Sequence, residues 1–82
     1  MLKLMSVSNP ADLRARVEVW LEVPAARGAP RVLHAVSYLE QREHQRRSVR
    51  WTEEGETLAA GARRVCQELC GGLGWGQAVL CA

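Results

Sequence analysis

The chain lacks the features that mark a membrane or secreted protein. It has no phenylalanine, and only 5% of its 82 residues are aromatic. No apolar run approaches the roughly 20 residues that a membrane-spanning helix needs, and the first residues, MLKLMSVSNP, lack the apolar core of a signal peptide. We therefore expect a cytoplasmic protein that does not associate with a membrane.

Cysteine is present, but not in the pattern of a metal site or a disulfide framework. The chain has three cysteines, an odd number, and no C-x-x-C pair. Small secreted domains pair their cysteines, and structural zinc sites usually carry a C-x-x-C knuckle. Cys66 and Cys70 are one helical turn apart, which does not suit a disulfide, although Cys81 can reach one of them. We expect buried free thiols at all three, with no metal and no cofactor.

Catalytic signatures are also missing. There is no G-x-S-x-G or H-E-x-x-H motif. The glycines between Gly71 and Gly76 follow an expected helix rather than preceding one, so the helix dipole there repels phosphate. His34 lies in an apolar segment, where a hydrogen-bonded structural histidine is the common case. We predict no catalytic residues and a non-enzymatic protein.

The composition is that of one small globular domain, residues 1–82. Hydrophobic residues make up 48% and charged residues 24%, without long polar tracts. The formal net charge is only +2, although all but one of the basic residues are arginine. A charge this small does not by itself indicate a nucleic-acid-binding protein.

The clearest element is an amphipathic helix expected over residues 52–72. Its apolar stripe is Leu58, Ala62, Val65 and Leu69, which recur at helical spacing. Thr52 can cap the first turn, and Gly71 or Gly72 can end the helix in the left-handed conformation.

Residues 11–23 fit two structures. Leu13, Val17 and Trp20 match a helix face, whereas the alternation of valine with charged residues matches a half-buried strand. Capping residues at 8–10, with proline at the first helical position, favour the helix. The valines favour the strand. We predict a helix here and keep the strand as the alternative.

The other segments are predicted as strands. Residues 2–7 suit a first strand, and 31–40 read as a central strand because both faces are largely apolar. Residues 45–51 return as a hairpin partner, with Val49 and Trp51 on one face, and residues 77–81 form a short apolar strand at the end.

This order of elements predicts an α+β, ferredoxin-like split βαβ fold (βαββαβ), with a four-stranded antiparallel sheet and two helices on one face. The likeness is one of element order and carries no function. If residues 11–23 form a strand, the alternative is a curled antiparallel sheet with a single helix at 52–72.

Candidate binding residues cluster around the basic strand 42–51. A basic row of His44, Arg46, Ser48 and Arg50 is expected on one face of this strand, with Tyr38 as a stacking surface. The candidate partner-binding or nucleic-acid-binding residues are Tyr38, Arg42, His44, Arg46, Arg47, Arg50 and Trp51. A solvated edge strand, protected by charge, explains the arginines without a ligand.

The sheet is expected to carry more apolar surface than two helices cover. Val32, Val36 and Tyr38, together with Trp20 or Trp75, form this surplus. We therefore expect a small protein-interaction or regulatory module that forms a homodimer through an exposed sheet face or binds another protein. The alternative is a nucleic-acid-binding domain that uses the basic strand.

Overall fold

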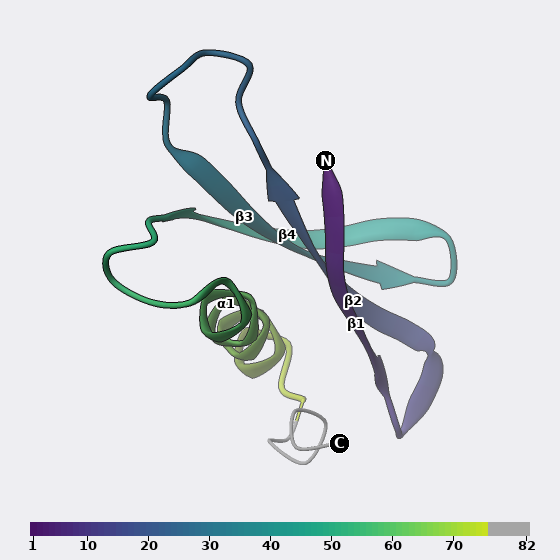
Figure 1. Cartoon of the computed structure of the whole chain (residues 1–82). Coiled ribbons are helices and arrows are strands. Elements are labelled where there is room, and N and C mark those ends of the chain that lie inside the picture. The colour runs from purple at the N-terminus through teal and green to yellow at the C-terminus, as the bar shows by residue number, and fades with distance from the viewer. Residues whose placement is uncertain (76–82) are drawn as a thin grey trace.

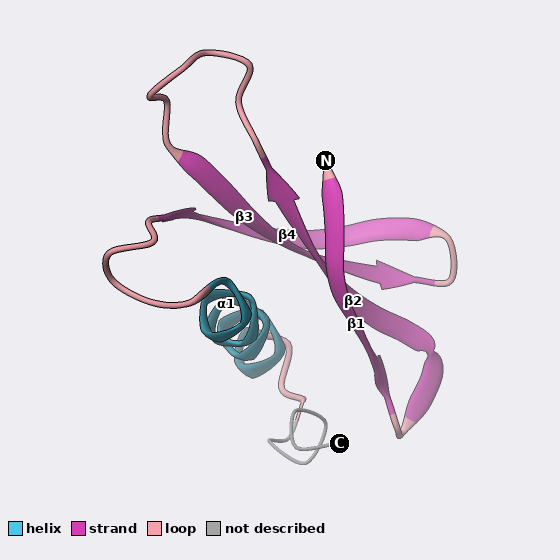
Figure 2. Ribbon diagram, in the orientation of Figure 1, coloured by secondary structure: helices cyan, strands magenta, loops and turns pink. Residues whose placement is uncertain are grey.

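An antiparallel sheet with one helix makes up the computed structural model, which describes residues 1–75 (Figure 1). The strands are β1 (Leu2–Asn9), β2 (Asp12–Glu22), β3 (Arg31–Leu39) and β4 (Arg42–Trp51), and the helix is α1 (Leu58–Gly72). Each strand pairs with the next along the chain, so the four-stranded sheet has the order β1-β2-β3-β4. Figure 2 shows α1 lying across one face of the sheet. Within residues 1–75, no helix has the length and apolar character needed to cross a membrane.

The helix predicted at residues 11–23 is wrong, because this segment is β2. Its polar start closes a tight hairpin with β1 instead of capping a helix. The Ala11 amide donates to Asn9 Oδ1 at 2.9 Å, and the Arg14 amide donates to Asp12 Oδ1 at 3.1 Å. Side chains of this type accept hydrogen bonds from backbone amides in turns as well as at helix starts. The residues that the sequence offered as helix caps are therefore equally typical of a hairpin turn.

The observed fold is therefore the single-helix alternative and not the two-helix arrangement. The central position of residues 31–40 is confirmed, since β3 pairs with both β2 and β4. The β3–β4 hairpin is also confirmed, with Leu39 opposite Arg42. The strand predicted at 77–81 lies outside the described residues.

Helix α1 begins later than predicted. Thr57, and not Thr52, is its N-cap, and the Thr57 side chain accepts a hydrogen bond from the Ala60 amide at 3.1 Å. At the other end, the left-handed position is Gly74, with φ of 79°, rather than Gly71 or Gly72. The Trp75 amide there donates to the Cys70 carbonyl at 2.9 Å, which satisfies one of the last carbonyls of the helix.

The core lies between α1 and one face of the sheet. The predicted helix stripe is confirmed, since Ala62, Val65 and Leu69 are buried and Leu58 is half-buried. The strands contribute the other side of this core: Val17, Val19, Leu21, Leu33, Ala35 and Trp51.

Two cysteines complete the core. Cys66 and Cys70 are both buried free thiols, with their Sγ atoms 4.0 Å apart. Burial raises the pKa of the Cys66 thiol to about 12, and the neighbouring Cys70 adds to this effect. Burial also raises the pKa of Cys70. Neither thiol forms the reactive thiolate at neutral pH. Cys81 lies outside the described residues.

Candidate interaction face

The face of the sheet opposite α1 is not covered by any described helix or strand. Side chains alternate between the two faces of a strand, so the residues between the core positions of β2, β3 and β4 point away from α1. The strand register arranges them in four rungs across the sheet. These are Arg16–Tyr38–Glu43, Glu18–Val36–Arg46, Trp20–His34–Ser48 and Glu22–Val32–Arg50. We call the surface that these rungs form the open face.

Glu18 organises one side of the open face. It is only 7% exposed, although none of the helices in residues 1–75 covers it. Arg16 Nε donates to Glu18 Oε2 at 2.9 Å, and Trp20 Nε1 donates to Glu18 Oε1 at 3.1 Å. The ammonium of Lys3 is 3.7 Å away. The hydrogen bond from Arg16 is the main cause that lowers the pKa of Glu18, against the opposing effect of burial. Glu18 is therefore charged at neutral pH and holds Arg16 and Trp20 in place.

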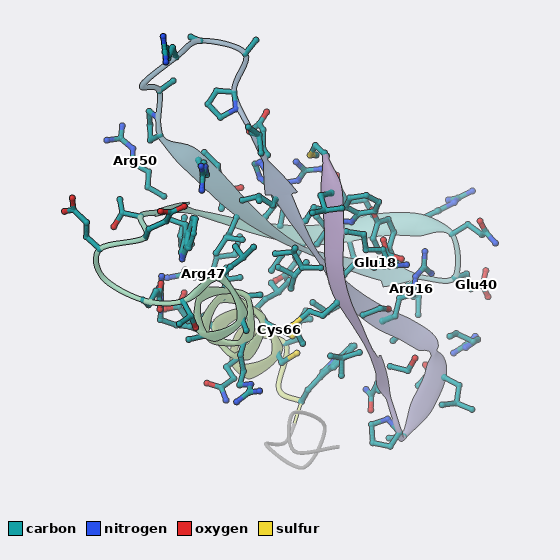
Figure 3. The ribbon with its side chains drawn as sticks, in the orientation of Figure 1. Arg16, Glu18, Glu40, Arg47, Arg50 and Cys66 are labelled. Carbon is teal, nitrogen blue, oxygen red and sulfur yellow. The ribbon has the colours of Figure 1, made fainter. Side chains whose placement is uncertain are left out.

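Arg16 extends this arrangement to β3. Its guanidinium carbon is 4.4 Å from the centroid of the Tyr38 ring, a cation–π contact. Arg16 Nη1 also donates to the carbonyl of Glu40 at 2.6 Å. Figure 3 shows Arg16 and Glu18 beside each other on the side of the sheet away from α1. Three large side chains, those of Arg16, Trp20 and Tyr38, are thus held in one geometry.

A second hydrogen-bonded chain crosses the middle of the open face. His34 Nδ1 is 2.7 Å from Ser48 Oγ, and His34 Nε2 is 3.0 Å from Glu22 Oε2. A serine, a histidine and a carboxylate in contact also occur in hydrolases. Such enzymes need N–H groups aimed at the reacting oxygen, whereas the backbone N–H groups of these strands lie in the plane of the sheet and Ser48 projects from it. We interpret this chain as structural, in agreement with the role predicted for His34.

The predicted binding residues do not share one surface. Tyr38, Arg46 and Arg50 lie on the open face, as their register positions require. The others lie elsewhere, for reasons of strand register and packing: Arg42, His44, Arg47 and Trp51.

The basic row predicted along β4 is wrong at His44. Ser37 pairs with Gln45 and Tyr38 pairs with Glu43, so His44 is an extra residue at a bulge. It lines a hollow with Leu73 and Trp75, beside the end of α1. Because a bulge shifts the alternation, His44 leaves the row that contains Arg46 and Arg50.

Trp51 and Arg47 face the helix. Trp51 is 6% exposed and belongs to the core. Arg47 Nε donates to Glu68 Oε2 on α1, and Figure 3 shows Arg47 next to the helix. Both residues are therefore engaged in packing the helix against the sheet.

The arginines that remain on the open face differ in their partners. Arg46 Nη2 donates to Glu43 Oε1 at 2.6 Å. Arg50 is exposed, and Figure 3 shows it pointing away from the sheet and from α1. Among residues 1–75, Arg50 has no carboxylate within ion-pair distance, whereas Arg46 has Glu43. Arg50 is thus the more available of the two for a partner.

The apolar residues expected in excess on the sheet do not form an exposed apolar patch. Val36 is only 2% exposed, because the side chains around it on the open face cover it. Trp20, Val32 and Tyr38 are half-buried in the same way, and Trp75 packs against the core instead. In the described part of the chain, the exposed large apolar residues are at element ends and in turns: Met1, Leu2, Leu13, Val23 and Leu39.

Sequence reasoning missed the acidic half of this site. Glu18 and Glu22 alternate with the valines of residues 11–23, so the strand interpretation of that segment would have put both on the face opposite the core. The helix interpretation did not place Glu18 and Glu22 on the sheet, so neither was predicted as part of the site. Among the described residues, no group of three histidine, cysteine or acidic side chains is placed to hold a metal ion.

No family model matches the chain, and no similar protein was found among curated proteins or solved structures. The function is therefore argued from the geometry of the open face.

Proposed function

We propose that the protein is a small, non-enzymatic protein-interaction module that acts as a homodimer through its open face. The observation that carries this proposal is the charge pattern across the rungs. Glu18 of β2 is in register with Arg46 of β4, and Glu22 is in register with Arg50. In these two rungs an acidic residue of β2 and a basic residue of β4 therefore flank the middle strand, β3, at matching heights; in the rung of Arg16, Tyr38 and Glu43 the two signs are exchanged.

This pattern is complementary to itself. Consider two copies packed face to face about a two-fold axis that runs along β3, between the two sheets. The axis places β2 of one copy over β4 of the other and keeps the height along the strands. Glu22 then lies opposite Arg50 of the second copy, and Glu18 lies opposite Arg46. Symmetric homodimers require such a self-complementary patch, and sheets commonly pack face to face in nearly aligned orientation.

The sizes of the side chains are complementary about the same axis. The rung between those of Glu18 and Glu22 has the large Trp20 on β2 and the small Ser48 on β4. The two-fold axis places the bulky ring of one copy over the small side chain of the other. The fixed geometry of Arg16, Trp20 and Tyr38 adds support, because these residue types dominate the energetics of protein interfaces and lose little side-chain freedom if they are already ordered.

A charge-swap experiment tests the proposal. The Glu22→Arg variant would place arginine opposite Arg50 in both halves of the dimer, and Arg50→Glu would place two carboxylates there. We expect each variant alone to sediment as a monomer at protein concentrations of about 1 to 100 µM, where weak dimers are populated. An equimolar mixture of the two variants should form a heterodimer, because every facing pair is then of opposite charge.

The matched controls separate this result from loss of folding. The double variant Glu22→Arg/Arg50→Glu restores opposite charges within one chain and should form a homodimer again. Arg42→Glu makes the same charge change as Arg50→Glu, but outside the open face, and should leave the dimer intact. A wild-type chain that is strictly monomeric over this concentration range, or a variant mixture that stays monomeric, would overturn the homodimer.

The nucleic-acid alternative has narrower support, since only Tyr38, Arg46 and Arg50 of the basic strand region share the open face. It requires affinity for a mixed-sequence oligonucleotide that falls steeply with salt and falls further in Arg50→Glu. Binding of this kind, with a monomeric protein, would favour nucleic acid over the homodimer. A cytoplasmic location is part of our proposal, because the free thiols at Cys66 and Cys70 suit a reducing compartment.

A further inference from the structure

A groove runs between the edge strand β1 and the helix α1, on the opposite side of the sheet from the open face. Helix α1 packs mainly on β2, β3 and β4 and touches β1 least. The space left over β1 is a groove of about 380 Å³. Its lining is mostly apolar: Leu4 and Met5 of β1, with Leu58, Ala59, Ala62 and Arg63 of α1.

β1 forms one edge of the sheet, so within residues 1–75 the backbone groups on its outer side have no strand partner. Proteins usually protect such an edge with charged side chains. β4, at the other edge, carries arginines and a glutamate along its length, but β1 has Lys3 as its only charged residue. The edge that borders the groove is therefore the one without this protection.

The rim of the groove is positively charged. Arg63 is exposed and lines the groove. The neighbouring Arg64 donates to Glu56 at 2.7 Å, whereas Arg63 has no carboxylate within ion-pair distance among the described residues. A free guanidinium beside an apolar groove and an open strand edge is complementary to an acidic, apolar, extended chain.

We propose that β1 and this groove bind an extended peptide segment of a partner protein, in which apolar residues alternate with polar ones and one position on the apolar side is acidic. The peptide pairs with β1 as an added strand, through backbone hydrogen bonds. Side chains of an added strand point alternately to its two faces, so the apolar side chains enter the groove. The acidic side chain on that same side lies at the rim and contacts Arg63. This mode of binding takes affinity from the backbone and specificity from the groove.

The site is separate from the open face. It uses β1 and α1, whereas the proposed dimer uses β2, β3 and β4 on the other side of the sheet. The charge-swap variants at Glu22 and Arg50 should therefore bind the peptide as the wild type does, and either proposal can fail without the other.

The test uses a fluorescein-labelled peptide in which valine alternates with threonine and glutamate replaces one central valine, matched to β1 in length, with anisotropy as the readout on the full chain. We expect saturable binding that Arg63→Glu weakens by about tenfold, the effect of losing one charge-assisted contact of about 1.4 kcal/mol. Ala59→Trp, which fills the groove from an exposed helix position, should abolish binding. Arg42→Glu, with the same charge change at the far edge, should bind as the wild type does.

Two control peptides test the mode of binding. Lysine in place of glutamate should weaken binding by at least about tenfold, because it faces Arg63 with like charge. Methylation of alternate backbone nitrogens should abolish binding, because it removes the donors of the added strand. Circular dichroism of each variant confirms that it is folded.

Several results would overturn the proposal. These are no binding of the glutamate-containing peptide by the folded wild type, equal weakening by Arg63→Glu and Arg42→Glu, or full binding of the methylated peptide. If Ala59→Trp instead dissociates a dimer of the protein, a second copy occupies the groove and the proposal is wrong.

Discussion

Gly61 should be required for the packing of α1 on the sheet, and Gly61→Ala should destabilise the protein. In an exposed helix interior the same change stabilises by up to about 1 kcal/mol, because glycine has the poorer helix propensity. Gly61 is buried, and a β-carbon there would lie 2.8 Å from Trp51 Cδ1 and 3.1 Å from Leu33 Cδ1. Favourable contacts between carbon atoms are about 3.5 to 4.0 Å, so one of the neighbours would have to move.

The size of the effect follows from how little space these neighbours have. Trp51 is 6% exposed and Leu33 is fully buried, so neither side chain can turn into solvent. Adding a methyl group to such a core typically costs about 1 to 3 kcal/mol. After subtraction of the helix-propensity gain, we expect Gly61→Ala to lower the free energy of unfolding by up to about 2 kcal/mol.

Gly71→Ala is the matched control. Gly71 lies in the same helix, is exposed, and has no atom within 4 Å of the position of an added β-carbon. Here only helix propensity changes, and we expect a stabilisation of about 0.5 kcal/mol, because the site is near the helix end. Urea denaturation measures the stability change of each variant. The midpoints can be compared directly if the m-values of the variants and the wild type are equal. If Gly61→Ala raises the midpoint as Gly71→Ala does, the packing argument is refuted.

A double variant identifies the contact responsible. Trp51→Val removes the indole ring and with it the atoms nearest to Gly61, Cδ1 and Nε1, of which Nε1 has no hydrogen-bond partner among the described residues. In the Trp51→Val background, Gly61→Ala should cost less by about 1 kcal/mol, a coupling typical of residues in contact. If Gly61→Ala costs the same in this background as in the wild type, the contact with Trp51 is not the source of the destabilisation.

Other consequences of the structure can be measured directly. Glu18→Gln should lower the free energy of unfolding at neutral pH by about 1.5 to 3 kcal/mol, the range for a hydrogen bond to a charged group. The folded-state pKa of Glu18 is lowered, so its contribution is present above the unfolded pKa and is lost as pH falls through the folded value; a gap between variant and wild type that persists unchanged in acid would contradict this. In a Cys81→Ser background, the remaining thiols should react with a thiol reagent at the rate of unfolding, because burial raises the pKa of Cys66 to about 12; fast labelling of the native protein would contradict it. Glu40 has φ of 60°, so Glu40→Gly should stabilise the protein slightly, by up to about 1 kcal/mol, and a lower urea midpoint would argue against strain there.

The elements that sequence reasoning predicted correctly are those whose signals are local. The apolar residues of α1 recur only at helical spacing, and the positions that this spacing predicts to be buried, such as Ala62, Val65 and Leu69, are buried. The β3–β4 hairpin needs only two adjacent segments, and the alternation that puts Val49 and Trp51 opposite Arg46 holds in the structure. The prediction of Trp51 as a binding residue is wrong, because the alternation of its strand places it on the core side.

Residues 11–23 could not be assigned in this way, because their sequence satisfies both periods. The structure resolves the ambiguity through partners that are distant along the chain. Val17 pairs with Val7 of β1 on one side and with Ser37 of β3 on the other. Capping residues at one end of the segment carry no information about these pairings. The bulge at His44 is similarly a product of the hairpin register and has no mark in the local sequence.

The assignment of this one segment also decides what the site is. If residues 11–23 were a helix, the arginines of β4 would stand as the only charged row on the sheet, and a phosphate backbone would be the natural partner. As a strand, the same residues place Glu18 and Glu22 at the heights of Arg46 and Arg50, with β3 between the two rows. An isolated basic row attracts any polyanion. Acidic residues on β2 and basic residues on β4 instead favour a surface that places basic residues over β2 and acidic residues over β4. A second copy of this chain carries that pattern by construction, which is why we place the homodimer ahead of nucleic acid.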